Sequence, residues 1–357
     1  MAEHFSKRTA TCGSLTKADD GKTVVLNGWV HRHRDHGIIH FINLRDRYGI
    51  TQVIVDDDSS KELQQAALSL NLEDCIAVTC VVRARPASMV NPEMATGEIE
   101  VKAEKIEILS TCAPLPFQID DGNVPREELR LKYRYLDLRT EGMKKRIKLR
   151  HDMVWAIRRY LSARGFYEIE TPTMIKSTPE GARDFLVPSR IHVGKFYALP
   201  QSPQLFKQIL MVGGMDKYFQ IARCYRDEDA RGDRQLEFTQ LDLEMSFVTR
   251  DDVLSTMEGL FGYVFKEVMD YDLPPTFRRF SYEEAMNTYG CDKPDLRFGL
   301  ELQDMNDLAS RSTFSTFKEI VAQGGHVKAL CAPHSEIVDF SRKYITDLEN
   351  AAKVYGA

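Results

Sequence analysis

The chain has 357 residues and a formal net charge of −5, and its 43% hydrophobic and 28% charged content is that of an ordinary soluble globular protein of two or three domains. No apolar run approaches the length of a membrane span, and the N-terminus lacks the apolar core of a signal peptide, so we expect a cytoplasmic protein without a membrane partner. The seven scattered cysteines form no C-x-x-C pair, which argues against a disulfide framework or a zinc site, and the acidic balance confines any RNA contact to a local surface.

Residues 1–110 are dominated by short β-type runs separated by turn signals such as Asp20-Gly21 and Tyr48-Gly49. The predicted strands are Thr23–Val30, Ile38–Leu44, Thr51–Asp56, Ile76–Ala84 and Glu98–Ile108. Lys61–Asn71 is expected to form one helix between the third and fourth strands. Five strands with a helix after the third are typical of a small Greek-key barrel of the OB type, which is a common platform for single-stranded nucleic acid.

The charge of this segment favours RNA binding. Between Asn27 and Arg47 there are four arginines, four histidines and only two aspartates. Phe41 can stack on an unpaired base, and Gln52 has the amide groups needed to read a base edge. The alternative is that the arginines form a solubilising rim and that Phe41 belongs to the barrel core.

Residues 111–145 are predicted to connect two domains. The prolines in Cys112–Phe117 cannot continue a β-ladder and therefore mark a boundary. The basic and aromatic run Lys132–Arg139 is then either a hinge beside a bound polyanion or a plain linker with solvated charges.

A long amphipathic helix is predicted over Ile147–Arg164, with Gly165 ending it and a strand over Phe166–Pro172. The apolar positions at helical spacing are Leu149, Met153, Ile157 and Leu161. After it, Ser177–Phe185 contains glycine and proline and is predicted to be a loop that can fold over a site.

A second helix is predicted to begin near residue 202, with Ser202 as its N-cap and Pro203 at its first position. Gln204 and Lys207 then lie on one face, where a lysine near a helix start makes a cationic pocket for a carboxylate. The other face is expected to direct Leu205, Ile209 and Met211 toward the core. The alternative is a surface lysine on an ordinary helix.

The stretch Arg223–Glu244 is a charged loop between two strand-like runs, Tyr218–Ala222 and Phe238–Phe247. Period-two alternation places the polar side chains of the second strand on one face and the apolar ones on the other. The polar set is Gln240, Asp242 and Glu244, and the apolar set is Leu241, Leu243 and Met245. A guanidinium at Arg226 and a carboxylate at Glu228 suit a nucleotide, by binding a phosphate and an adenine amine respectively. The alternative is a solvated hairpin with surface ion pairs.

The segment after the hairpin, Asp251–Val268, is predicted to be an amphipathic helix behind the sheet.

Arg226-Asp227-Glu228 followed by Glu237-Phe238-Thr239-Gln240-Leu241-Asp242 closely resembles motif 2 of class II aminoacyl-tRNA synthetases, in the wording of bacterial aspartyl enzymes. The segments Gly28–Asp35, Lys132–Arg139 and Gln201–Gln208 are similar to further blocks of that family. The resemblance implies an α+β multidomain fold, with an OB-fold anticodon-binding domain over 1–110 and a hinge over 111–145. It also implies an antiparallel catalytic domain over 146–287 and the start of an inserted α+β domain over 288–357.

The resemblance also implies residue roles. Arg226 would be the catalytic residue, neutralising charge on the α-phosphate of ATP and touching the aspartate carboxylate. ATP would contact Arg226, Asp227, Glu228 and Gln235; aspartate would contact Glu180, Gln204, Lys207, Arg226 and Asp242; the anticodon would contact Arg34, Phe41 and Gln52. Mg²⁺ would bridge the phosphates, and the helix–strand–proline layout of motif 1 would build a homodimer.

The implied function is ATP-dependent activation of L-aspartate and its transfer to tRNA(Asp). In the family, histidine at the position of His36 accompanies charging of both tRNA(Asp) and tRNA(Asn), so relaxed tRNA choice is an alternative to strict choice. The glycine-rich, arginine-bearing motif 3 is absent before Ala357. We therefore expect a C-terminally truncated chain that does not fold fully in its C-terminal half and does not charge tRNA by itself. Other hypotheses are a non-catalytic RNA-binding protein derived from the family and a sister ligase for asparagine or lysine.

Overall fold

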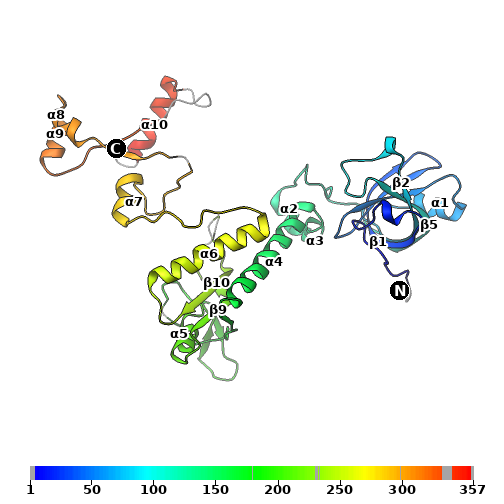
Figure 1. The fold of residues 1–357 in the computed structure, drawn as a ribbon, viewed down its shortest axis with the longest axis horizontal. Coiled ribbons are helices and arrows are strands. Elements are labelled where there is room, and N and C mark those ends of the chain that lie inside the picture. The colour runs from blue at the N-terminus through cyan, green and yellow to red at the C-terminus, as the bar shows by residue number, and fades with distance from the viewer. Residues whose placement is uncertain are drawn as a thin grey trace. The chain divides into compact units, whose positions relative to one another are not determined.

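The computed structural model describes residues 5–178, 180–229, 232, 234–297, 299–331 and 340–354. The chain divides into two compact units, one formed by Met1–Val253 with Leu260–Asp272 and the other by Leu254–Gly259 with Leu273–Ala357. Figure 1 shows the elements of both units. Among the described residues, no helix is both long enough and apolar enough to cross a bilayer.

The N-terminal part of the first unit is a closed five-stranded barrel with the strand order β1-β2-β3-β5-β4, which confirms the predicted OB-type fold. Its elements are β1 (Thr23–Asp35), β2 (His40–Arg45), β3 (Ile50–Val55), α1 (Lys61–Leu68), β4 (Cys75–Ala84) and β5 (Ile99–Ser110), with short 3₁₀ turns at Lys17–Asp19 and Ala87–Met89. Strand β1 pairs antiparallel with β2 and β4, and the barrel closes through a parallel β3–β5 pair. Ser60 caps α1, which ends three residues before the predicted Asn71.

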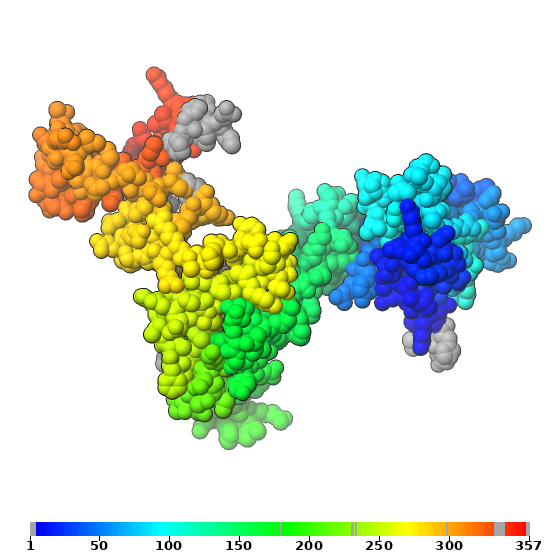
Figure 2. All heavy atoms as spheres, in the orientation of Figure 1, coloured from blue at the N-terminus to red at the C-terminus, as the bar shows by residue number. Residues whose placement is uncertain are grey.

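One hydrophobic core fills the barrel. Alternate side chains of β1 to β5 point inward, and Val30, Ile42, Leu44, Val53, Ile76 and Val101 are fully buried. In the space-filling view the blue-to-cyan atoms of this region form one densely packed body (Figure 2). Phe41 is only half-buried and lies outside this core. The alternative interpretation of Phe41 as a core residue is therefore wrong.

The connector contains α2 (Glu127–Lys132) and α3 (Arg134–Asp137). Buried Glu73, held in a left-handed conformation at φ 66°, accepts hydrogen bonds of 2.7 Å from both Arg45 and Arg139. The guanidinium of Arg139 also lies 4.7 Å from the centre of the Trp29 indole. Arg139 therefore belongs to a buried ion-pair network, and its interpretation as a solvated linker charge is wrong.

The part of the first unit that follows the connector is built on a sheet with the order β10-β9-β6. Its elements are α4 (Glu141–Ser162), β6 (Tyr167–Glu168), β7 (Leu186–Pro188), β8 (Phe196–Ala198), α5 (Gln204–Val212), β9 (Lys217–Tyr225), β10 (Glu237–Met245) and α6 (Arg250–Met269). Helices α4 and α6 run alongside the β9–β10 hairpin in Figure 1, and the rings of Tyr160 and Tyr263 meet between them at 5.4 Å. The predicted strand over Phe166–Pro172 is only two residues long, because β6 pairs with β9 through Tyr167 and Glu168 alone.

Two predicted apolar faces are only partly buried. On α4, Ile157 and Leu161 pack inward, but Leu149 and Met153 are exposed. Near its C-terminal end α4 packs on α6 through Tyr160 and Tyr263, whereas Arg150 beside Leu149 reaches the sheet by a hydrogen bond of 3.0 Å to Thr239. On α5, Leu205 and Ile209 are likewise exposed, and the expectation that they face the core is wrong.

The second unit contains short elements. They are α7 (Tyr282–Tyr289), β11 (Leu302–Asp304), α8 (Asn306–Arg311), α9 (Ser315–Ala322), β12 (Lys328–Leu330) and α10 (Arg342–Val354). Strands β11 and β12 form a two-stranded antiparallel sheet. Ser281 caps α7, and Gly290 ends that helix at a positive φ of 68°.

Candidate functional site

The polar face of the β9–β10 hairpin carries the first candidate site. Asp242 pairs with Gln220 and Glu244 with Tyr218 across the hairpin, so Gln240, Asp242 and Glu244 share one face as the alternation predicts. Gln220 accepts from the hydroxyls of Tyr218 at 2.8 Å and of Thr171 at 3.0 Å. The second strand of the hairpin therefore presents carboxylates against a network of hydroxyls and amides rather than against the core.

Lys207 of α5 reaches this face. Its ammonium donates to Asp242 Oδ1 at 3.0 Å and lies 3.2 Å from Glu244 Oε2, and its side chain is only 13% exposed. Burial favours the neutral amine, but the two carboxylates outweigh it and raise the pKa of Lys207. The pKa of Asp242 is also raised, in this case by burial, although the positive charge of Lys207 opposes the shift. The surface-lysine alternative is therefore wrong.

The start of α5 differs from the prediction. The helix begins at Gln204 with Pro203 as its N-cap, and Pro203 makes no side-chain capping bond. Ser202 is not the cap, because its hydroxyl donates to Glu180 Oε2 at 2.6 Å instead. Gln204 and Lys207 remain one turn apart, and both are partly buried.

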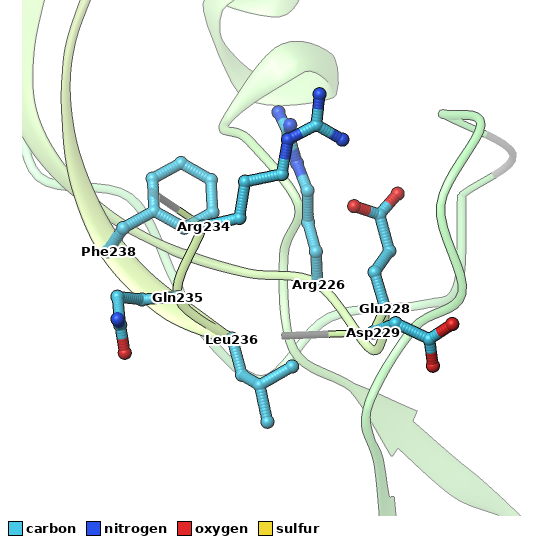
Figure 3. Close-up of a pocket in the computed structure, with 7 residues that line it drawn as sticks. All are labelled: Arg226, Glu228, Asp229, Arg234, Gln235, Leu236 and Phe238. Atoms are coloured by element: carbon cyan, nitrogen blue, oxygen red, sulfur yellow. The ribbon is translucent and has the colours of Figure 1, made fainter. Parts of the chain in front are cut away.

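A cavity of about 390 Å³ opens at the base of the hairpin and is lined by Arg226, Glu228, Asp229, Arg234, Gln235, Leu236 and Phe238. The guanidinium of Arg226 lies 5.0 Å from the centre of the Phe238 ring. Figure 3 shows the guanidinium ends of Arg226 and Arg234 and the carboxylate of Glu228 directed to the same side, whereas Gln235 and Leu236 point the other way. Two cations, a carboxylate and an aromatic face are groups that can hold a phosphate chain and a stacked base.

A second and more polar cavity of about 410 Å³ adjoins the first and is lined by Gly181, Ala182, Arg183, Asp227, Glu228, Asp229 and Arg234. The two cavities share Glu228, Asp229 and Arg234. Asp227 lines this second cavity and not the one around Arg226, and its backbone N–H donates to the carbonyl of Arg183 at 3.0 Å. The segment after Ser177 is therefore hydrogen-bonded to the loop that carries Arg226.

Cys224 of β9 is buried, and its thiol donates to Gln240 Oε1 on the polar face of β10 at 3.1 Å. Burial first, and then the charges of Asp242 and Glu180, raise the pKa of Cys224 to about 11, while Arg226 opposes the shift. Direct contacts join Lys207 to Asp242 and Glu180 to Ser202, just before α5.

The barrel carries a separate candidate site. Arg34, His36, Phe41 and Gln52 line one cavity of about 350 Å³ together with Arg85 and Glu100. Arg34 donates to Gln52 Oε1 at 3.1 Å, and its guanidinium lies 5.6 Å from the centre of the Phe41 ring. The His36 ring meets Phe41 edge-on at 5.7 Å. Residues from strands β1, β2, β3 and β5 and from the loops around His36 and Arg85 are thus brought to one surface.

Sequence reasoning missed several of these residues. Arg85 and Glu100 lie 3.4 Å apart in the barrel cavity, and burial lowers the pKa of Arg85 and raises that of Glu100. Their separation in the chain hides this pairing. Phe238 could have been found, because the alternation that places Gln240 on the polar face also places Phe238 there. Gln201 belongs to the family-like block Gln201–Gln208, but nothing in the local pattern predicts that this glutamine after Pro200 is buried.

The fold and the two sites describe a barrel that presents arginines and an aromatic ring, followed by a sheet that presents a nucleotide-sized cavity. Residues 24–109 match the family described as OB-fold nucleic acid binding domain, and residues 126–349 match the tRNA synthetases class II (D, K and N). The chain belongs to the class II tRNA synthetases of this group.

Two bacterial relatives carry the name Aspartate--tRNA(Asp/Asn) ligase. The protein of Treponema denticola is 62% identical over 98% of this chain and 59% of its own length, and that of Treponema pallidum strain Nichols is 54% identical over 99% and 58%. The chain therefore spans about three fifths of the length of these curated relatives. The asparaginyl-tRNA synthetase of Pyrococcus horikoshii, solved with asparaginyl-adenylate, has the same fold, with a TM-score of 0.66 at 22% identity over 94% of this chain and 70% of that one.

Proposed function

We propose that this chain carries the amino-acid-activating and anticodon-reading parts of an aspartate–tRNA ligase. The observation that carries the proposal is the buried Lys207 ammonium, held by Asp242 and Glu244 on the polar face of the hairpin. A positive charge so held selects an amino acid whose side chain ends in a carboxylate, and it disfavours a neutral amide or an ammonium. The names of the relatives support aspartate as that amino acid.

In the proposed reaction the α-carboxylate of aspartate attacks the α-phosphorus of ATP, a mixed anhydride forms and pyrophosphate leaves. No side-chain nucleophile is required, so the protein contributes positioning and charge stabilisation. Arg226 neutralises the charge that builds on the α-phosphate, with Phe238 stacking beside it. The aminoacyl group then passes to a ribose hydroxyl of the tRNA and AMP leaves.

Polar residues around the sheet supply the remaining contacts. Glu180 and Asp242 are anionic partners for the α-ammonium of aspartate, and one oxygen of Asp242, Oδ2, is buried without a hydrogen-bond partner among the described residues. Gln204 lies one turn before Lys207 and supplies an amide at the same helix start. Glu228 and Gln235 line the cavity for ATP, and Asp227 borders it.

Magnesium bound together with ATP would supply positive charge that neutralises part of the charge of the phosphates. Within the described part of the chain, the one group of three acidic residues spaced to hold a metal is Asp56, Asp57 and Asp58, in the barrel. Among the described residues that line the cavity of Arg226, the carboxylates are Glu228 and Asp229. Glu228 and Asp229 are therefore the side chains of this cavity that would hold a phosphate-bound Mg²⁺.

The barrel cavity reads the tRNA. Phe41 stacks on an unpaired anticodon base, and Arg34 and Gln52 bind base edges. Arg85 Nε lies 3.4 Å from Glu100 Oε2, whereas its Nη2 is buried without a hydrogen-bond partner among the described residues, so Nη2 can donate to a base as well. His36 borders the same cavity, which supports charging of both tRNA(Asp) and tRNA(Asn).

Two further properties belong to this proposal. The exposed apolar side chains of α4 and α5 support a homodimer, because a second copy can cover Leu149, Met153, Leu205 and Ile209. All seven cysteines lie in the described part of the chain and are free, which supports a cytoplasmic location.

The test is direct binding of three sulfamoyl-adenosine analogues of the aminoacyl-adenylate by calorimetry. We expect the aspartyl analogue to bind at least about tenfold more tightly than the asparaginyl and lysyl analogues, because only its carboxylate pairs with Lys207. Tighter binding of either other analogue would assign a sister ligase. A protein that binds an anticodon stem-loop but none of the three analogues would be assigned to the non-catalytic RNA-binding alternative.

A further inference from the structure

A buried glutamine grips the segment that carries Glu180. Gln201 is 2% exposed and lies three residues after the end of β8. Its Oε1 accepts from the backbone N–H of Ala182 at 3.0 Å, and its Nε2 donates to the carbonyl of the same residue at 2.8 Å. One carboxamide thus satisfies both backbone groups of Ala182, in the way a neighbouring strand would.

The same carboxamide makes a third bond. Gln201 Nε2 also donates to Asp184 Oδ1 at 2.6 Å, and Asp184 Oδ2 accepts from the Ser177 hydroxyl at 2.5 Å. Beside it, Ser202 donates to Glu180. Two consecutive residues, Gln201 and Ser202, therefore hold three positions of the segment 180–185.

Gly181 makes the close approach possible. Its φ of +105° is a backbone conformation that side-chain-bearing residues rarely adopt, and it turns the chain between Glu180 and Ala182. The residue after Ala182 is also held, because the Arg183 carbonyl accepts from the N–H of Asp227, which follows Arg226 in the chain. The segment is therefore fastened both to the start of α5 and to the loop of the phosphate-binding arginine.

We propose that Gln201 is a positioning residue that fixes segment 180–185 so that the Glu180 carboxylate meets the α-ammonium of aspartate. This role rests on the proposed function. Gln201 acts through Ala182 and Asp184 and does not itself touch the substrate. An apolar side chain could fill the same space without the cost of burying an amide. The amide of Gln201 instead makes three hydrogen bonds to the segment, which indicates that its role is to hold the segment in place.

The test uses a charge change and its reversal in the whole protein. In Gln201→Glu the new carboxylate keeps an acceptor for Ala182 but faces the Asp184 carboxylate, so the two repel and the segment separates from residue 201. In the double variant Gln201→Glu with Asp184→Asn, the asparagine amide donates to the glutamate and can still accept from Ser177. The control is Gln208→Glu, an identical change at an exposed position of α5.

Two readouts are needed. The first is hydrogen–deuterium exchange of peptides that cover Ala182 in the ligand-free protein, where Gln201→Glu should exchange at least about tenfold faster than the wild type. The second is the dissociation constant of the aspartyl sulfamoyl-adenosine analogue, which should rise about 10- to 100-fold while that of ATP stays within about twofold. The double variant should regain most of both losses, and Gln208→Glu should match the wild type.

The outcomes separate this role from the proposed function. Unchanged exchange in Gln201→Glu, or faster exchange with unchanged analogue binding, would overturn the positioning role. Equal weakening of ATP and analogue without recovery in the double variant would show a general loss of folding and would also overturn it. If the wild-type protein shows slow exchange at Ala182 but binds neither ATP nor the analogue, the proposed function is refuted, and the positioning role of Gln201 is refuted with it. The slow exchange would still agree with the hydrogen bonds between Gln201 and Ala182.

Discussion

Lys207 is surrounded by more negative charge than it can neutralise. Two carboxylates, Asp242 and Glu244, share one ammonium on a half-buried face. Such a cluster suits a ligand that brings both charges, because its ammonium can join the carboxylates while its carboxylates join Lys207 and Arg226. L-Aspartate, with one ammonium and two carboxylates, has this charge pattern.

Replacing Lys207 with methionine tests this interpretation at the residue scale. Lys207→Met keeps the length of the side chain but removes the cation, so the affinity for the aspartyl sulfamoyl-adenosine analogue should fall by about 100-fold or more. The affinity for the asparaginyl analogue should change much less, because its amide does not need a cation. Calorimetric titration of both analogues measures the difference.

The matched control is Lys195→Met, at an exposed lysine between β7 and β8. It should leave both affinities at the wild-type level. An aspartyl affinity in Lys207→Met within a few-fold of the wild type would contradict the assignment of Lys207 to the substrate side chain.

Cys224 reports on the same site through its pH dependence. Its pKa is raised to about 11 from its usual value of 9.0, so the reactive thiolate is scarcer than in an ordinary thiol over the whole range below pH 9. At pH 8 the thiolate fraction is about 100-fold lower, and alkylation should accelerate about tenfold per pH unit up to about pH 11. Mass spectrometry after iodoacetamide treatment, with exposed Cys291 as the reference, measures the rates. A rate for Cys224 equal to that of Cys291 at pH 8 would contradict the burial of the thiol among these charges.

At this scale the sequence identified the charges of the site but not every partner of each charge. The alternation of β10 was sufficient to place Asp242 and Glu244 on one face, and the helix position of Lys207 was sufficient to suggest a cation near it. The capping role expected of Ser202 failed because a distant carboxylate, Glu180, competes for its hydroxyl. A side chain with two possible partners cannot be assigned from local pattern alone.

Among the elements, the turn over 91–97 shapes the barrel cavity. Asn91 N–H donates to the carbonyl of Gly97 at 3.1 Å, and Gly97 N–H donates to that of Met94 at 2.8 Å. A Cβ added at Gly97 would lie 1.8 Å from the carbonyl oxygen of Asn91, so the backbone must move. Asn91 lines the cavity that holds Arg34, Phe41 and Gln52.

Gly97→Ala should therefore weaken binding of the tRNA(Asp) anticodon stem-loop by about tenfold or more and lower the free energy of unfolding by about 1–3 kcal/mol. Fluorescence anisotropy with a labelled stem-loop and denaturant unfolding measure the two effects. Gly122→Ala is the control, since the nearest atom to its added Cβ is a flexible Asp120 carboxylate oxygen at 3.4 Å. Wild-type stem-loop binding by Gly97→Ala would show that this turn does not shape the RNA site.

Helices were predicted better than the faces they bury. The spacing of apolar residues located α4 and α6 to within a few residues of their bounds, apart from the N-terminal turns of α4. It could not show which residues of the α4 stripe are covered, because periodicity reports that a stripe is apolar and not what covers it. Exposed Leu149 and Leu205 are the result.

For the whole molecule, the two candidate sites use different residues and different folds. Arg34→Ala should weaken stem-loop binding by about tenfold and leave the aspartyl-analogue affinity unchanged, and Arg226→Ala should do the reverse. Measuring both ligands on both variants tests the separation. A loss of analogue binding in Arg34→Ala would contradict it.

The barrel and the hairpin could be predicted because each is specified by local alternation and turns. The buried network of Glu73, Arg45 and Arg139 could not, since it joins a left-handed residue between two elements to charges 28 and 66 positions away in the chain. The pairing of Arg85 with Glu100 was hidden for the same reason. Long-range polar contacts depend on the assembled fold, which local patterns do not encode.

The central claim is that the polar face of the β9–β10 hairpin and the cavity at its base hold one aspartyl-adenylate. A crystal structure of the protein with the aspartyl sulfamoyl-adenosine analogue tests it most directly. We predict the sulfamoyl group within hydrogen-bond distance of Arg226, the adenine against Phe238, and the aspartate side-chain carboxylate paired with Lys207. An analogue bound at any other place, or bound here with its side chain turned away from Lys207, would contradict the account.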